Sequence, residues 1–174
     1  MPKILESIRE QLLETARRQI GKNGYGSTTI RSVASECGIA VGTVYNYFPS
    51  KDVLIATVVS EDWLGCLASI ASEREDDPRT HLKRIYDALC AFSQRYQTLF
   101  SDADAEKSYR AVFAERHRQL RAQLAALIAP VLHDAPDAAF RSEFLAQSLL
   151  TWTLEGKPFD ALYGVMQHLI KQRK

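Results

Sequence analysis

The stretch TIRSVASECGIAVGTVYNYFPSKD, from Thr29 to Asp52, decides the fold that the sequence predicts. Apolar Ile30 and Val33 recur at one-turn spacing, which predicts a short helix with one packing face. Thr29 stands where an N-cap is expected, and Gly38 stands where this helix must end. A glycine adopts the left-handed conformation without a Cβ clash, so the chain can turn sharply there.

A second short helix is predicted after this turn. Val44 and Phe48 lie four residues apart and therefore face inward together. Pro49 then ends the helix, and Ser50 is a candidate N-cap for the helix that follows. The side chains left to face mainly outward are small, polar or aromatic, and they are Val41, Gly42, Thr43, Tyr45, Asn46 and Tyr47.

This outward set suits the major groove of DNA, which admits an α-helix whose side chains reach base edges while flanking groups bond phosphates. We expect Thr43 and Asn46 to help read bases. We expect Lys51, Tyr45 and Tyr47 to position the phosphate backbone. The full set of predicted DNA-binding residues is Thr29, Arg31, Val41, Gly42, Thr43, Tyr45, Asn46, Tyr47 and Lys51.

With the helix before it, this block resembles the N-terminal DNA-binding domain of the TetR family of one-component transcriptional regulators, over about Ile8 to Ile55. Three features carry the resemblance: the opening TIRSVA at Thr29 to Ala34, the Gly-Ile pair at the turn, and the run GTVYNYFPSK from Gly42 to Lys51. The departure is Ala40, where that family usually has a serine that caps the recognition helix. Gly42 also stands where many members have a basic residue.

The resemblance implies an all-α fold in two domains. Residues 1–52 are expected to form a three-helix, helix-turn-helix DNA-binding domain. Residues 53–174 are expected to form a helical effector-binding and dimerisation domain. The implied protein is a homodimeric regulator, most simply a repressor, that leaves a palindromic double-stranded DNA operator when it binds a small, largely apolar effector.

Composition agrees with a globular protein of this size, because 46% of the 174 residues are hydrophobic and 25% are charged. The sequence shows no run of about 18 to 20 apolar residues and no signal-peptide core, so we expect no membrane span and a cytoplasmic location. The three cysteines, Cys37, Cys66 and Cys90, are widely spaced in apolar patterns. They are expected to be reduced, mostly buried thiols, with a redox switch as the alternative.

The net charge of +1 hides an asymmetry along the chain. Through Lys51 there are seven basic and four acidic residues, so this part carries +3 and the remainder carries −2. This charge is modest for a monomeric DNA-binding protein, and useful affinity is therefore expected to need two copies on one site.

Helical spacing continues through the rest of the sequence. Apolar residues from Ile4 to about Ile20 predict a supporting helix, and the glycine-rich GKNGYGS after it reads as a helix end and loop rather than a phosphate-binding loop. Val53 to Ala71 predicts a helix that links the two domains. Asp77 and Pro78 mark the start of another, and the amphipathic pattern of that helix continues to Phe100.

The last two predicted helices, Ala138 to Leu154 and Phe159 to Ile170, carry more apolar surface than one chain easily buries. In the TetR family the final two helices usually form a four-helix dimer interface. The alternative is that both helices merely close the core of one chain. The predicted interface residues are Phe140, Phe144, Trp152, Phe159, Leu162, Tyr163, Met166, Leu169 and Ile170.

Aromatic residues in the predicted effector-binding domain are numerous enough to line an apolar pocket between helices. The alternative is that they fill the core, because helical spacing predicts burial and not a cavity. The candidate ligand-binding residues are Trp63, Phe92, Tyr96, Tyr109, Phe113, His117 and Trp152.

Catalytic readings find little support. His81, His117, His133 and His168 form no metal-binding pair at helical spacing, and no nucleophile motif is present. The acidic segment from Asp102 to Glu106 lacks the glycine and terminal glutamate of a calcium loop. We therefore predict no enzyme activity, no metal and no cofactor. The alternative function is a helical module whose helix-turn-helix binds a protein instead of DNA.

Overall fold

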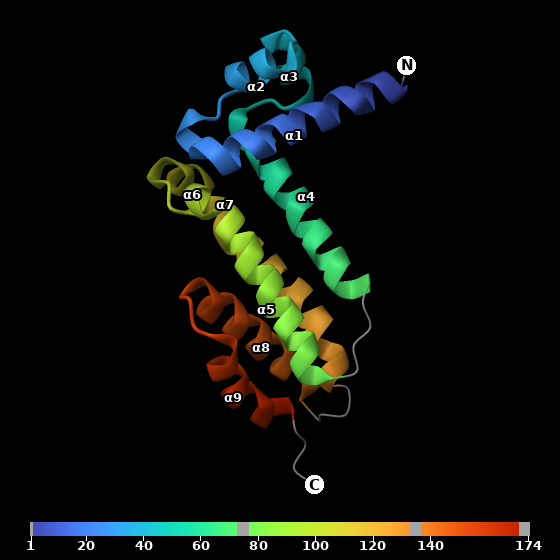
Figure 1. Cartoon of the computed structure of the whole chain (residues 1–174), viewed down its shortest axis with the longest axis vertical. Coiled ribbons are helices and arrows are strands. Elements are labelled where there is room, and N and C mark those ends of the chain that lie inside the picture. The colour runs from blue at the N-terminus through green and yellow to red at the C-terminus, as the bar shows by residue number, and fades with distance from the viewer. Residues whose placement is uncertain (1, 73–76, 133–136, 171–174) are drawn as a thin grey trace. The chain divides into compact units, whose positions relative to one another are not determined.

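The computed structural model describes residues 2–72, 77–132 and 137–170, with the side chains of all these except residues 2–6, 104 and 106–116. The described chain is helical and contains no strand, which confirms the predicted all-α class (Figure 1). The elements are α1 (Pro2–Ser27), α2 (Ile30–Cys37), α3 (Val41–Tyr47), α4 (Lys51–Ser72), α5 (Pro78–Arg95), α6 (Gln97–Phe100), α7 (Ala103–Ile128), the 3-10 turn η1 (Ala129–Leu132), α8 (Ala138–Leu154) and α9 (Phe159–Ile170).

The chain divides into two compact units whose boundary differs from the predicted one. The first unit comprises residues 1–64 and 95–110, and the second comprises residues 65–94 and 111–174. The first twelve residues after Asp52 thus belong to the same unit as the helix-turn-helix. Residues 95–110, near the middle of the sequence, belong to it as well. Gly65, a weak helix former, stands at this division, but the helical apolar pattern continues across it and therefore did not indicate a boundary.

The core of the first unit forms where α1, α2, α3 and the start of α4 meet. Leu12 and Ile20 of α1, Val33 of α2, Val44 of α3 and Val58 of α4 are all completely buried. Burying one such side chain contributes about 1.5–3 kcal/mol. In Figure 1, α2 and α3 lie together against α1, as this shared core requires.

Helix α1 is longer than the pattern predicted. It continues beyond Ile20, and Gly24, with φ of 74° and ψ of −175°, interrupts its helical conformation. The hydroxyl of Thr28 donates a hydrogen bond of 2.9 Å to the Gly24 carbonyl and closes this irregular turn. The glycine-rich segment therefore ends the helix as predicted, but several residues later.

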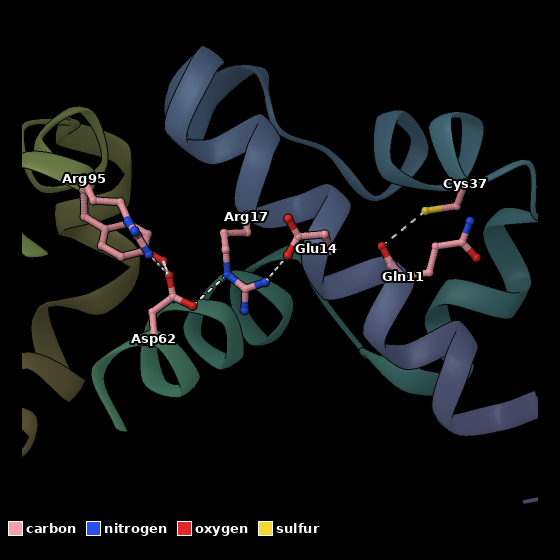
Figure 2. Close-up of polar contacts among 7 residues, drawn as sticks. Gln11, Glu14, Arg17, Cys37, Asp62 and Arg95 are labelled. Carbon is pink, nitrogen blue, oxygen red and sulfur yellow. Dashed lines mark hydrogen bonds and ion pairs between the residues drawn. The ribbon is translucent and has the colours of Figure 1, made fainter. Parts of the chain in front are cut away.

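A carboxylate in α4 binds the middle segment of the chain to the first unit. The Asp62 side chain is only 8% exposed, and it accepts hydrogen bonds from Arg17 Nε at 2.7 Å and Tyr96 Oη at 2.7 Å. Arg95 Nη1 donates a third at 3.0 Å. Figure 2 shows Arg17 between Asp62 and Glu14, with Arg95 on the other side of Asp62.

The same cluster explains why the amphipathic pattern ending at Phe100 does not form one helix. At Tyr96 the backbone leaves the helical conformation, with φ of −108° and ψ of 16°, so α5 ends at Arg95 and α6 begins at Gln97. Tyr96 is 1% exposed, and its hydroxyl reaches Asp62 from this position. Periodicity alone did not indicate this break.

The second unit has its core between α5, the end of α7, α8 and α9. Leu82, Ile85, Leu124, Leu145 and Leu149 are completely buried there. The start of α5 is capped as predicted: the Thr80 amide donates to the Asp77 carboxylate at 2.9 Å. Helices α8 and α9 have the bounds that the sequence predicted.

Side-chain contacts fasten the ends of these helices. His81 is buried, and one of its ring nitrogens donates to the Leu127 carbonyl at 2.8 Å, joining α5 to α7. The Tyr86 hydroxyl donates to the Lys157 carbonyl at 2.9 Å, and the Phe159 ring lies 5.5 Å from the Tyr86 ring. These contacts hold the α8–α9 loop and the start of α9 on α5.

Helix α4 is long and apolar enough, by length and composition only, to cross a membrane, although the sequence has no uninterrupted apolar run of that length. A buried core helix passes the same test. Leu54, Ile55 and Val58 of α4 are at most 1% exposed and belong to the core of the first unit.

Candidate nucleic-acid interface

The start of α2 is fixed by two reciprocal hydrogen bonds. The Ser32 amide donates to Thr29 Oγ1 at 2.9 Å, and the Thr29 amide donates to Ser32 Oγ at 2.9 Å. Together they form a capping box, with serine in place of the usual Glu or Gln. The predicted N-cap at Thr29 is confirmed.

The turn between α2 and α3 depends on Gly38. Its φ of 68° is in the left-handed region that disfavours residues with a Cβ. The Ile39 amide donates to the Ala34 carbonyl at 3.0 Å, and the Gly38 amide donates to the Ser35 carbonyl at 3.2 Å. These bonds satisfy the last carbonyls of α2, so the predicted helix end is confirmed.

Helix α3 buries one face and exposes the other. Val44 and Phe48 are 0% and 3% exposed, and they anchor the helix in the core of the first unit. Tyr45 is 52% exposed, and Gly42 and Asn46 are exposed as well. Val41 and Thr43 are half-buried. Ala40, the N-cap of α3, makes no side-chain cap, as its methyl group requires.

Tyr47 differs from the other residues of the outward set. The residue is half-buried, and its hydroxyl oxygen is buried with no hydrogen-bond partner among the described residues. In this conformation the hydroxyl does not face solvent, so it is not placed to contact a phosphate. Helical spacing predicted an outward Tyr47 because spacing indicates only the side of the helix on which a residue lies. It does not specify the side-chain rotamer, which decides where the hydroxyl lies.

Lys51 lies at the first position of α4. The Val53 amide donates to Ser50 Oγ at 3.2 Å, which confirms the predicted cap of this helix. The Lys51 ammonium lies 3.6 Å from the centroid of the Tyr25 ring. Sequence analysis missed Tyr25, because the residue lies in a glycine-rich segment that reads only as a loop.

Several other basic residues of this unit are engaged in ion pairs. Arg18 Nη2 lies 2.5 Å from Glu36 Oε1, and Arg9 Nη2 lies 2.8 Å from Glu61 Oε1. Arg31 is exposed and, within the described side chains, forms no ion pair. Arg31 of α2 and Lys51 of α4 are the basic residues nearest to α3 on either side in the sequence.

All three cysteines are free thiols and half-buried, which makes them more accessible than the mostly buried thiols we expected. Cys37 Sγ donates to Thr15 Oγ1 at 3.3 Å and lies 3.8 Å from the Gln11 carbonyl (Figure 2). In the described chain, no group of three or more His, Cys, Asp or Glu side chains is arranged to hold a metal ion.

The predicted ligand-binding residues are divided between the two units. Trp63 and Tyr96 are buried in the first unit, and burial together with the Asp62 hydrogen bond raises the pKa of Tyr96. These two therefore belong to the core of the first unit. In the second unit Phe92 is half-buried, while His117 and Trp152 are exposed. The side chains of Tyr109 and Phe113 lie outside the described residues, as does His133.

The predicted interface residues divide into two groups. Phe140, Phe144 and Trp152 of α8 are 69%, 49% and 41% exposed. In contrast, Phe159 and Met166 are 4% and 3% exposed, so both pack within a single chain and their role in an interface stays a prediction. The half-buried members are Leu162, Tyr163, Leu169 and Ile170.

Two apolar residues that were not among the predicted interface residues are also exposed. Leu154 of α8 is 57% exposed and Val165 of α9 is 68% exposed. Leu154 belonged to the apolar pattern of its helix, whereas Val165 lies beside the stripe that sequence analysis assigned to α9. Its position off the stripe agrees with its exposure.

The capped α2, the glycine turn and the outward face of α3 define a helix-turn-helix protein of the DNA-binding class. The family model described as bacterial regulatory proteins, tetR family, matches residues 12–58. These residues run from the middle of α1 into α4 and include the whole of α2 and α3. The N-terminal region of the chain therefore belongs to the TetR family of bacterial regulatory proteins.

Individual relatives agree with this assignment. The chain is 33% identical over 63 residues to the HTH-type transcriptional regulator UidR of Escherichia coli, covering 36% of this chain and 32% of the relative. It is 35% identical over 60 residues to the HTH-type transcriptional repressor KstR2 of Mycolicibacterium smegmatis, covering 33% and 29%. The matches thus span about a third or less of the length of these curated relatives.

The fold of the whole chain is also similar to solved structures. A TetR transcription regulator from Haloarcula marismortui superposes with a TM-score of 0.67 over 94% of both chains, at 20% identity. At this identity the likeness concerns the fold, which is an N-terminal helix-turn-helix followed by a helical C-terminal part.

Proposed function

We propose that this chain is a homodimeric transcriptional repressor that binds a palindromic operator through α2 and α3. The observation that carries this proposal is the outward face of α3, which is held rigidly by buried Val44 and Phe48 and is flanked by Arg31 and Lys51. A rigid helix with exposed polar side chains and adjacent cations is what major-groove recognition requires.

The proposed contacts fall into two kinds. Asn46 and Thr43 read base edges, because hydrogen-bonding side chains on the exposed face of a recognition helix reach the groove floor. Arg31, Tyr45 and Lys51 bind phosphates and set the register of α3. Tyr47 joins them only if its side chain rotates so that its buried hydroxyl reaches solvent.

The proposed dimer forms through the apolar surface of α8 and α9. The exposed aromatic rings of Phe140 and Phe144 lie 6.4 Å apart on α8, and Val165 of α9 is exposed as well. Contiguous exposed apolar side chains favour association, and a two-fold dimer would bury the same patch on both copies. The modest positive charge of residues 1–51 also favours two copies on one DNA site.

Release by an effector is the remaining part of the proposal. Helix α4 begins at Lys51, and its residues from 65 onward belong to the second unit, so one helix passes from the DNA-reading unit into the other. In the dimer, the two α3 helices must be spaced so that both enter the major groove. A small, largely apolar ligand lowers DNA affinity if it favours another spacing. Linkage then requires the operator to weaken ligand binding by the same factor, about 5- to 150-fold for a coupling of ~1–3 kcal/mol.

Selection of bound sites from random double-stranded DNA tests the proposed function. The expected result is an enriched two-fold symmetric sequence whose half-site centres lie one helical turn apart, or a multiple of that spacing. Thr43→Ala should change the preferred base at particular positions of each half-site, while Arg31→Ala should weaken all sequences alike.

The alternative is a helix-turn-helix that binds a protein, and it predicts the opposite result in the selection experiment. Such a module would enrich no sequence, and any residual DNA binding would not change at individual bases in the Thr43→Ala variant. A chain that remains monomeric at micromolar concentration would contradict the dimer part of the proposal. If a ligand binds equally well with and without the operator, measured by calorimetry, release by that ligand is excluded.

A further inference from the structure

Tyr25 touches both of the first two residues of α4. It lies near the C-terminal end of α1 and is 7% exposed. Its ring centroid is 3.6 Å from the Lys51 ammonium, and its hydroxyl donates to Asp52 Oδ1 at 2.5 Å. One buried aromatic side chain therefore contacts a cation and a carboxylate that are adjacent in sequence.

The ring contact restricts a side chain that is otherwise flexible. Lysine carries its charge on a four-carbon stem and loses rotamer freedom whenever it binds a partner. The face of an aromatic ring attracts an ammonium, so Tyr25 limits the positions of Lys51 before any DNA arrives. Restricting a side chain in advance lowers the entropy lost on binding.

The ring contact is compatible with binding a phosphate. An ammonium has three donors, and a ring face occupies only one side of it. The Tyr25 hydroxyl meanwhile fixes the carboxylate of Asp52, which is the acidic group closest to Lys51 in sequence. The same side chain therefore sets the positions of both charges at the start of α4.

We propose that Tyr25 is a positioning residue for DNA binding, whose ring holds the Lys51 ammonium in place for a backbone phosphate. The inference rests on the proposed DNA-binding function. Tyr25 itself does not touch the DNA. It acts through Lys51, and its effect on affinity should disappear when that charge is removed.

The contact itself can be tested without DNA. Protons above an aromatic ring move upfield in NMR spectra, so the ε-methylene protons of Lys51 should be shifted upfield in the wild-type protein. In Tyr25→Phe the shift should persist, and in Tyr25→Leu it should be lost. Unshifted Lys51 protons in the wild-type protein would overturn the proposal.

The effect of the Tyr25–Lys51 contact on DNA affinity is tested by a double-mutant cycle on mixed-sequence DNA. Tyr25→Leu should lower affinity about 2- to 5-fold, the range expected for one partly exposed cation–aromatic contact. Tyr25→Phe keeps the ring and should retain affinity within about twofold. Lys51→Met should flatten the salt dependence by about one phosphate contact per bound protomer, and in that background Tyr25→Leu should have no further effect.

The chain offers a matched control. The ammonium of Lys83 lies 5.8 Å from the Tyr86 ring in the second unit, so Lys83→Met removes one charge from a similar pair. It should leave the salt dependence of DNA binding unchanged. Should Tyr25→Leu fold poorly, a pentafluorinated phenyl ring at position 25 keeps the shape but reverses the ring's charge distribution, and it should reproduce the loss.

Two results would overturn the positioning role. One is an equal loss from Tyr25→Leu with and without the Lys51 charge, which would show that Tyr25 only stabilises the fold. The other is a loss from Tyr25→Phe as large as from Tyr25→Leu. If Lys51→Met changes neither affinity nor salt dependence, the proposed phosphate contact itself fails, whereas the NMR shift still decides whether the ring holds the lysine.

Discussion

Helices α3 and α8 use their apolar residues in opposite ways. Helix α3 buries Val44 and Phe48 and presents mainly polar or small groups, with one exposed tyrosine, Tyr45. Helix α8 buries Leu145 and Leu149 completely but leaves Phe140 and Phe144 69% and 49% exposed on its other side. The first arrangement suits a polar partner, and the second suits another apolar surface. The following experiments test this difference, from the largest expected effect to the smallest.

The first experiment separates core from interface on the C-terminal helices. Phe159 is 4% exposed and stacks on Tyr163 with ring centroids 5.6 Å apart, so Phe159→Ala should lower the free energy of unfolding by about 3–5 kcal/mol. This loss should not depend on protein concentration. Phe140→Ala should instead destabilise mainly through weaker association, so its effect should shrink when denaturation is followed below the dimer's dissociation constant.

Equal, concentration-independent losses in both variants would show that α8 has no interface role. Sedimentation of both proteins provides the control, because only Phe140→Ala should shift the monomer–dimer equilibrium.

A second comparison uses one ion pair from each unit. The Asp62 carboxylate is buried under three donors, so Asp62→Ala removes the shared acceptor of Arg17, Tyr96 and Arg95 and should cost about 2–3 kcal/mol. Asp160, whose side chain is 81% exposed, pairs with Arg79 at 2.8 Å. Asp160→Ala should change stability by about 1 kcal/mol or less. Urea denaturation of the two variants measures both effects, and similar losses would contradict the assigned role of burial.

The free energy of unfolding at acid pH should depend on the same carboxylate, that of Asp62. Burial raises the pKa of Asp62, but hydrogen bonds from Tyr96, Arg17 and Arg95 outweigh it and lower the pKa below the usual 3.8. A lowered folded-state pKa contributes stability that is complete above the unfolded-state value and is lost as pH falls through the folded-state value. The free energy of unfolding should therefore fall below about pH 4. Asp62→Asn should show a shallower fall there, and an unchanged slope would exclude this contribution.

The smallest expected effects come from the helix caps. Thr29→Ala removes the acceptor for the Ser32 amide and should cost ~1 kcal/mol. Ala40→Ser supplies a cap that α3 lacks and should add ~0.5–1 kcal/mol. Thermal denaturation measures both. Capping would be the wrong explanation if Ala40→Ser destabilised the protein.

These contrasts also explain what the sequence could predict. Caps, glycine turns and helix ends depend on residues close in sequence, and Thr29, Gly38, Ser50 and Asp77 all have the predicted roles. Such local rules also located the outward face of α3.

Long-range packing was the part that sequence could not supply. Phe140 and Phe159 both lie on apolar stripes, but only the fold shows that Phe159 meets Tyr86 of α5. The break at Tyr96 likewise depends on a carboxylate in another helix, and the buried hydroxyl of Tyr47 depends on a rotamer. Residues that act through distant partners, such as Tyr25, carry no local signal.

The central claim is that two copies of the α2–α3 unit bind DNA together, and a salt titration tests it most directly. Affinity for the selected operator, measured by fluorescence anisotropy, should fall linearly on logarithmic axes as salt rises, with a slope of about −0.9 per phosphate contact. Phe140→Glu, which charges the exposed face of α8, should leave the helix-turn-helix folded but reduce this slope to about half, since one reader then binds alone. A wild-type affinity independent of salt, or an identical slope in the Phe140→Glu variant, would contradict the account.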